Sequence, residues 1–150
     1  MFRGSHDAKV DEKGRLKLPA AFKALMDAQN FTQVFVTSIN GRWAEIWPLP
    51  EWVKLEAKLA RHSSLDPAVQ EFMNVVNFYG HQVEMDNQGR ILLPQFLRDK
   101  AKLTAEVKVM GQNDHLAIHN LAELAKVVPI DGMADDKQSR ISGYLTEAKV

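Results

Sequence analysis

The stretch Asp11-Glu12-Lys13-Gly14-Arg15-Leu16-Lys17-Leu18-Pro19 returns later in the chain as Asp86-Asn87-Gln88-Gly89-Arg90-Ile91-Leu92-Leu93-Pro94. Asp, Gly, Arg, Leu and Pro recur at identical spacing, and Leu16 is matched by Ile91. Self-similarity of this kind is the signature of a repeated supersecondary unit. The repetition therefore predicts a fold built from two related halves.

The similarity extends to both sides of these two stretches. Phe2-Arg3-Gly4 resembles Phe78-Tyr79-Gly80, and Ile46-Trp47-Pro48 aligns loosely with Ile118-His119-Asn120. The predicted organisation is a first repeat at residues 1–60, a helical connector at 61–76, a second repeat at 77–127 and a tail at 128–150. Hydrophobic density falls after Pro129, so the tail is expected to be loose or to contain a short docking helix.

Composition excludes several classes of function. The 150 residues are 45% hydrophobic and 25% charged, which is typical of a soluble globular chain. The absence of Cys excludes disulfides and cysteine nucleophiles. No apolar run approaches the ~20 residues that a membrane helix needs, and the first residues lack an apolar signal core. A cytoplasmic location with no membrane partner is therefore expected.

The distribution of charge is more informative than its sum. The net charge is zero, with 19 basic and 19 acidic residues, which by itself argues mildly against nucleic-acid binding. Residues 1–23, however, contain six basic side chains against three acidic ones. The C-terminal stretch is more acidic. The chain therefore has a basic beginning that could face an anionic partner.

Local patterns predict the same order of elements in each repeat, namely strand, turn, strand, short helix, two strands and a helix. Gly14 and Gly89 suit the positive φ of a tight turn, and the alternation of Arg15-Leu16-Lys17-Leu18 suits a half-buried strand. Pro19 and Pro94 are predicted in the first turn of a helix. The predicted class is α+β and β-rich.

The connector region shows two apolar stripes at helical spacing. Trp52, Leu55 and Leu59 form the first, and Asp66-Pro67 suits the start of a second helix, with Asp as the N-cap and Pro at the first helical position. The second stripe consists of Val69, Phe72, Met73 and Val76. Both stripes are interpreted as packing surfaces rather than as ligand sites.

Residues for catalysis or metal binding are few. His115 and His119 have an i, i+4 spacing but fall in a predicted strand and turn, so they are interpreted as structural or surface residues. Asp11 and Asp86 each precede an arginine by four residues, which suits an ion pair across the turn and an ionised carboxylate. We therefore expect no catalytic residue, no metal site and no cofactor.

The repeated arginines, Arg15 and Arg90, have two possible roles that do not exclude one another. Each can hold its own turn together through the nearby aspartate. Each can also present a guanidinium group to phosphates or base edges, for which its bidentate geometry is suited. Lys13 and Lys17 flank the first arginine, whereas Gln88 and Leu92 occupy the equivalent positions in the second repeat. The first repeat is accordingly expected to contribute more cations.

These motifs resemble the MraZ family of bacterial transcriptional regulators. The resemblance covers about residues 1–127 and rests on the Phe-Arg-Gly start, both Asp-x-x-x-Arg turns, Glu45-Ile46-Trp47 and Gly89-Arg90-Ile91-Leu92-Leu93-Pro94. It implies two tandem SpoVT/AbrB-like units of the swapped-hairpin type, forming a pseudo-twofold barrel with peripheral helices. Two departures from the common pattern are Lys102 in Ala101-Lys102-Leu103 and His119 after Ile118.

The resemblance also implies a function. The protein would bind double-stranded DNA at repeated elements upstream of its own division and cell-wall gene cluster, at the nucleoid, as a ring-like homo-oligomer. Carried over by position, the DNA-facing residues would be Arg15, Lys13, Arg3, Lys17 and Arg90. A ring would repeat the basic beginning of the chain many times and so answer the objection of zero net charge.

Two other functions remain open from the sequence, an antitoxin-like module that binds a protein partner and, less favoured, a small β-barrel enzyme.

Oligomerisation has its own sequence argument. Trp43, Trp47, Trp52 and Phe72 are many large rings for small half-domains, and some are expected at subunit contacts. The alternative is that all four fill the core of a single chain.

Overall fold

The computed structural model describes residues 1–147. In chain order the elements are β1 (Ser5–Val10), β2 (Arg15–Lys17), α1 (Ala20–Ala28), β3 (Gln33–Thr37), β4 (Ala44–Pro48), α2 (Leu49–Leu59), α3 (Pro67–Tyr79), β5 (His81–Glu84), β6 (Arg90–Leu92), α4 (Gln95–Ala101), β7 (Ala105–Gly111), β8 (Leu116–Asn120), α5 (Leu121–Leu124) and α6 (Asp135–Thr146). The first four strands belong to the first predicted repeat and the last four to the second.

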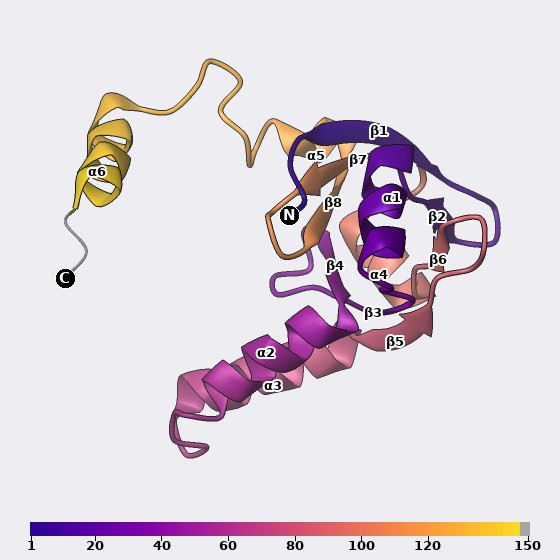
Figure 1. Ribbon diagram of the computed structural model, residues 1–150, viewed down its shortest axis with the longest axis horizontal. Helices are drawn as coiled ribbons and strands as arrows, with labels where there is room; N and C mark the ends of the chain where they lie inside the picture. Colours follow the sequence, from indigo (N-terminus) through magenta and orange to yellow (C-terminus); the bar gives the residue numbers. More distant parts are fainter. Residues whose placement is uncertain (148–150) are drawn as a thin grey trace.

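The eight strands within residues 1–147 form one antiparallel sheet in the order β5-β3-β4-β8-β7-β1-β2-β6. The two outer strands, β5 and β6, are joined by the second turn, so the sheet curls into a nearly closed barrel (Figure 1). The equivalent strands of the two repeats are β1 and β5, β2 and β6, β3 and β7, and β4 and β8. If each strand is replaced by its equivalent, the order of neighbours around the barrel stays the same. The barrel therefore has pseudo-twofold symmetry, and the α+β, β-rich class predicted from the sequence is confirmed.

The two repeats are interleaved rather than side by side. β1 pairs along its whole length with β7 of the other repeat, and β5 pairs in the equivalent way with β3. β4 and β8 then join the two repeats at one end of the pseudo-twofold axis, and β2 and β6 join them at the other. Neither repeat can bury its strands without the other, so the barrel forms as one unit.

The barrel interior is filled by apolar side chains from both repeats. Leu16 and Ile91 are completely buried, as are Leu97 and Met26 from helices α4 and α1. Phe2 and Phe22 meet edge to face in the same core, with ring centroids 5.8 Å apart. The alternation predicted for the repeated motif is confirmed, because the residues on either side of Leu16 face outward.

Helices α2 and α3 form a hairpin that projects from the barrel (Figure 1). Their apolar stripes meet the barrel in a second cluster made by Phe35, Trp47, Trp52 and Val76. The predicted helix start is confirmed, since the Asp66 side chain accepts a hydrogen bond from the Ala68 amide and the helix begins at Pro67. This hairpin occupies residues 49–79, a longer segment than the predicted connector at 61–76.

One sequence-based expectation needs correction. Pro19 and Pro94 are N-cap residues rather than members of the first helical turn, because their ψ angles of 141° are extended. The Pro19 carbonyl still accepts from the Phe22 amide, so the proline directs the chain into the helix. Of the four large rings considered for subunit contacts, Trp47 and Trp52 are buried within the chain, at 6% and 4% exposure, whereas Trp43 and Phe72 are partly exposed.

The predicted tail at 128–150 contains helix α6, which stands apart from the barrel in Figure 1 and has no buried residue. Residues 148–150 of that tail lie outside the described part of the chain. Among residues 1–147, no helix combines the length and apolar character required to cross a bilayer.

Candidate nucleic-acid interface

The first repeated turn is held together by the carboxylate of Asp11. Its Oδ1 accepts hydrogen bonds from the amides of Lys13 and Arg15 at 3.0 and 2.9 Å, and its Oδ2 accepts from Arg15 Nε at 2.8 Å. The Gly14 amide donates to the Asp11 carbonyl at 2.9 Å, and Gly14 has a φ of +83°. The carboxylate therefore fixes both the backbone of the turn and the direction of the arginine side chain.

The second turn repeats this geometry at Asp86. Oδ1 accepts from the amides of Gln88 and Arg90 at 2.9 and 2.8 Å, and Oδ2 accepts from Arg90 Nε at 2.7 Å. Gly89 has a φ of +76°. The ion pairs expected from the four-residue spacing are thus present in both turns. A holding role for the arginines is established by these contacts.

The same hydrogen bonds keep the aspartates ionised. The Arg15 amide, followed by its guanidinium group, lowers the pKa of the Asp11 carboxyl below its ordinary value of 3.8. The Arg90 amide and guanidinium lower the pKa of Asp86 in the same way. Only Nε of each guanidinium is engaged within residues 1–147, which leaves both terminal Nη groups turned to solvent. Four N–H donors of each guanidinium, two on each Nη, are therefore available to an external acceptor.

Strands β2 and β6 join the two turns into one two-stranded ribbon. The register pairs Arg15 with Leu92, Leu16 with Ile91 and Lys17 with Arg90. Reciprocal hydrogen bonds extend the pairing, from the Leu18 amide to the Gly89 carbonyl and from the Leu93 amide to the Gly14 carbonyl, both at 2.9 Å.

Because side chains alternate along a strand, the paired strands have one buried face and one outward face. Leu16 and Ile91 lie inward, and the outward face, here called the ribbon face, consists of Arg15, Lys17, Arg90 and Leu92.

Strand pairing adds a relation between cations of the two repeats on the ribbon face. Lys17 follows Arg15 in the chain, but it lies directly across from Arg90. Arg15 instead lies across from Leu92, and its second cation is Lys13 in the same turn. Lys17 therefore lies beside both arginines, on the same face of β2 as Arg15 and directly across from Arg90.

Each turn is also covered by a basic side chain from the other repeat. The Arg98 guanidinium of α4 packs on Gly14, where an added Cβ would lie 2.4 Å from Arg98 Cζ. The Lys23 side chain of α1 packs on Gly89 in the equivalent way, with Cδ 2.7 Å from such a Cβ. Arg98 Nε donates to the Leu93 carbonyl at 2.9 Å. Sequence reasoning did not select either residue, although both follow the repeated motif at the same distance.

Arg3, which was grouped with the turn residues, lies elsewhere. It precedes β1, whereas the Asp11 turn follows β1, and six strand residues span about 20 Å. Figure 1 shows the N-terminus near β4 and β8, with the turns at the opposite side of the barrel. The structure therefore places Lys13, Arg15, Lys17 and Arg90 together and leaves Arg3 apart.

The histidines lie away from the ribbon face. His115 Nδ1 is 2.7 Å from Asp114 Oδ1, and its ring stacks on Trp47 with centroids 4.0 Å apart. His119 is buried beside Trp43, and this burial lowers its pKa. Within residues 1–147, no three potential ligand residues are grouped as a metal site would require.

The sequence of the chain matches a known family. Residues 1–74 and 79–129 match the family described as "MraZ protein, putative antitoxin-like". The chain belongs to the MraZ family. The sequence-based resemblance is thereby confirmed.

Relatives in the MraZ family align over most of this chain. The Transcriptional regulator MraZ of Acidobacterium capsulatum is 49% identical over 140 residues, which cover 93% of this chain and 96% of that protein. The protein of the same name from Koribacter versatilis is 47% identical over 83% of this chain and 85% of its own length. That from Thiobacillus denitrificans is 34% identical over 81% and 82%. The names of these MraZ proteins describe regulators of transcription, not enzymes.

Proposed function

We propose that this member of the MraZ family regulates transcription by binding double-stranded DNA through the ribbon face. The observation that carries the proposal is the joining of two turns into one ribbon, which places Arg15, Lys17 and Arg90 on a single outward surface. Diagonal neighbours across paired strands are about 7–8 Å apart, so one duplex can meet both arginines. The relatives named as transcriptional regulators support the same conclusion.

The geometry of the turns suits DNA for two reasons. A guanidinium group anchored through Nε is already oriented, so little side-chain entropy is lost when its Nη groups meet phosphate oxygens or a guanine edge. Lys13 and Lys17 add point charges that contact phosphates without reading sequence. Arginines at the centre with lysines around them therefore provide both specificity and affinity.

The proposed target follows from family membership. It consists of repeated elements upstream of the protein's own division and cell-wall gene cluster, and binding there would place the protein at the nucleoid. The proposed working form is a ring-like homo-oligomer, which presents one ribbon face per subunit to successive repeats.

An exposed aromatic pair supports self-association. Phe78 and Phe96 meet edge to face with centroids 5.1 Å apart, yet they are 67% and 56% exposed. Large apolar groups left on a surface mark interaction sites. Light scattering across a micromolar range should therefore return a multiple of 16.9 kDa. A mass equal to one chain at all concentrations would contradict the oligomer.

The decisive experiment is Arg15→Ala, with Arg61→Ala in the α2–α3 loop as the matched control. Fluorescence anisotropy would compare both variants on a duplex taken from upstream of the protein's own gene and on a scrambled duplex. We expect Arg15→Ala to lose the preference for the upstream duplex while its melting temperature remains close to that of the control. A folded Arg15→Ala protein that binds like the control would remove the proposed interface.

The same data address the antitoxin-like alternative. If neither the native protein nor the control binds either duplex at low salt, a protein partner becomes the better explanation of the ribbon face.

A further inference from the structure

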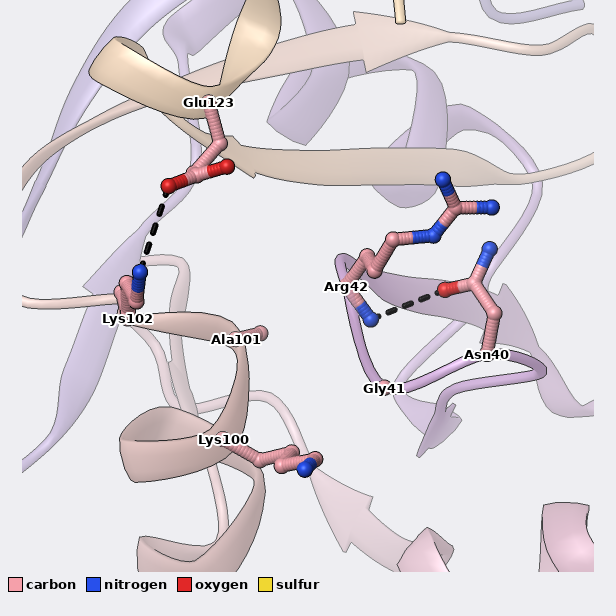
Figure 2. A pocket seen from close by; sticks show the side chains of 7 residues that line it. All are labelled: Asn40, Gly41, Arg42, Lys100, Ala101, Lys102 and Glu123. Carbon is pink, nitrogen blue, oxygen red and sulfur yellow. Dashed lines mark hydrogen bonds and ion pairs between the residues drawn. The ribbon is translucent and has the colours of Figure 1, made fainter. Parts of the chain in front are cut away.

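A second basic site lies at the junction of the two repeats, away from the turns. It is a cavity of about 250 Å³ between the β3–β4 loop of the first repeat and the end of α4 in the second. The lining residues, shown in Figure 2, are Asn40, Gly41, Arg42, Lys100, Ala101, Lys102 and Glu123. Three cations thus share one small hollow with a single carboxylate.

The carboxylate is already engaged. Glu123 accepts from Lys126 at 2.9 Å and from Lys102 at 3.2 Å, and these two lysines lower the pKa of its carboxyl. Within residues 1–147, neither Arg42 nor Lys100 has a carboxylate within 4.0 Å. The cavity therefore has an uncompensated positive charge, a situation that attracts an anion.

The backbone brings these cations together by specific local geometry. Gly41 has a φ of +75°, and a Cβ there would meet Tyr79 Oη at 2.7 Å and Lys100 Cγ at 3.3 Å. Lys102 ends α4 in the left-handed conformation, with its carbonyl held by Asn120 Nδ2 at 2.9 Å. The Asn40 side chain accepts from the Arg42 amide at 2.9 Å. The loop and the helix end are thus each held by their own hydrogen bonds, and they approach each other closely at Gly41 and Lys100.

The pseudo-twofold symmetry allows the cavity to be compared with the equivalent position in the other half of the barrel. The equivalent position in the other half combines the β7–β8 loop, residues 112–115, with the end of α1, residues 25–30. Those segments read Gln-Asn-Asp-His and Leu-Met-Asp-Ala-Gln-Asn, which contain two aspartates and no Lys or Arg. These two segments therefore carry fewer cations than the walls of the cavity, although the Met1 ammonium group donates to Asn113 in the equivalent loop.

We propose that this cavity binds a small anion through its phosphate group. In Figure 2 the Arg42 guanidinium lies beside Asn40, and it is placed over the Trp43 ring, while Lys102 Nζ is directed to Glu123. A phosphate beside Lys100 would be met when the Arg42 and Lys102 side chains turn inward, Arg42 with its planar fork and Lys102 as a point charge. A volume of about 250 Å³ is smaller than the usual pocket for a drug-sized ligand, and so fits a phosphate or diphosphate group. The source is either a free phosphorylated ligand or a phosphate of bound DNA.

Titration calorimetry with pyrophosphate, against chloride of equal ionic strength, tests the proposal on the full-length chain. The test variant is Arg42→Gln with Lys100→Gln, and the control, Lys54→Gln with Lys58→Gln on α2, removes two cations from another surface. We expect pyrophosphate affinity to fall at least tenfold in the test variant and to change less than twofold in the control. Equal affinity in both, or equal heats from chloride, would overturn the proposal.

Further measurements separate the two sources and guard against misfolding. If affinity for a short duplex also falls in the test variant, the phosphate belongs to DNA; if only pyrophosphate binding falls, the ligand is free. If the test variant melts at a lower temperature than the native protein, the single variant Lys100→Gln, at an exposed position, replaces it. We expect this variant to bind pyrophosphate at least threefold more weakly, and an unchanged affinity would count against the site. Arg15→Ala should leave pyrophosphate binding unchanged. The ribbon-face proposal and the cavity proposal can therefore fail independently of each other.

Discussion

Exchanging Lys17 and Leu92 tests the ribbon face directly. These two residues occupy equivalent positions in the two repeats and lie beside Arg90 and Arg15 respectively. Leu92 is 49% exposed, so Leu92→Lys should change the free energy of unfolding by no more than about 0.5 kcal/mol. The change would give Arg15 the cross-strand lysine that Arg90 already has. Lys17→Leu is the matched variant, because it removes the lysine from the equivalent position of the first repeat.

The expected magnitude follows from the release of counterions. Each phosphate contact adds about −0.9 to the slope of log K against log salt, for each subunit that touches the duplex. Between 1 M and 0.1 M salt this corresponds to a gain of about 8-fold in affinity, or ~1.2 kcal/mol. Leu92→Lys should therefore steepen the slope by about 0.9 per bound subunit, and Lys17→Leu should flatten it by the same amount.

The assay is fluorescence anisotropy of a labelled duplex over a series of KCl concentrations, with light scattering to show an unchanged oligomer. The double variant, Lys17→Leu with Leu92→Lys, keeps the number of cations and only moves one across the pseudo-twofold axis. Its slope should match that of the native protein. If both single variants also keep the native slope, the ribbon face does not contact DNA and the argument fails.

Three further predictions concern stability. Gly14→Ala should lower the free energy of unfolding in urea by about 1–2 kcal/mol, because a φ of +83° disfavours a side chain. In an Arg98→Ala background this destabilisation should be smaller, and a larger one would contradict the packing of Arg98 on Gly14. Leu16→Ala, at a fully buried site on the pseudo-twofold axis, should cost about 2–4 kcal/mol by calorimetry, and a cost well below this would show that the ribbon is poorly packed. Asp11 and Asp86 have lowered pKa values in the folded state, so their stabilisation is present above the ordinary value of 3.8 and is lost as pH falls through the folded pKa values. Urea unfolding from pH 6 to pH 2 should therefore show a shallower loss in Asp11→Asn with Asp86→Asn, and identical pH profiles would refute this linkage.

The parts of the site that sequence reasoning predicted correctly are local. The Asp11 carboxylate reaches amides two and four residues away, so the residue types and their spacing were sufficient to predict the turn and its ion pair. The same applies to the Asp66 cap. The doubled motif further predicted two related halves and the β-rich class. Such features depend on short-range geometry, which the residue types and their spacing determine.

The misjudged parts depend on contacts between distant segments. Lys17 was considered only with Arg15, its neighbour in the chain, and strand pairing places it directly across from Arg90 as well. Arg98 was overlooked because its relation to Gly14 exists only after α4 packs over the other repeat's turn. Trp47 could not be assigned to core or surface until the α2–α3 hairpin was seen to cover it.

The sequence by itself determined the two turns, their charged residues and the repetition that makes the halves alike. Only the tertiary structure decided which cations share a surface, because each repeat exchanges its first strand with the other. That exchange pairs β2 with β6 and creates the ribbon face, and it brings the β3–β4 loop against α4 to form the basic cavity. Burial of apolar strands drives the pairing, and the positions of the charged groups follow from it.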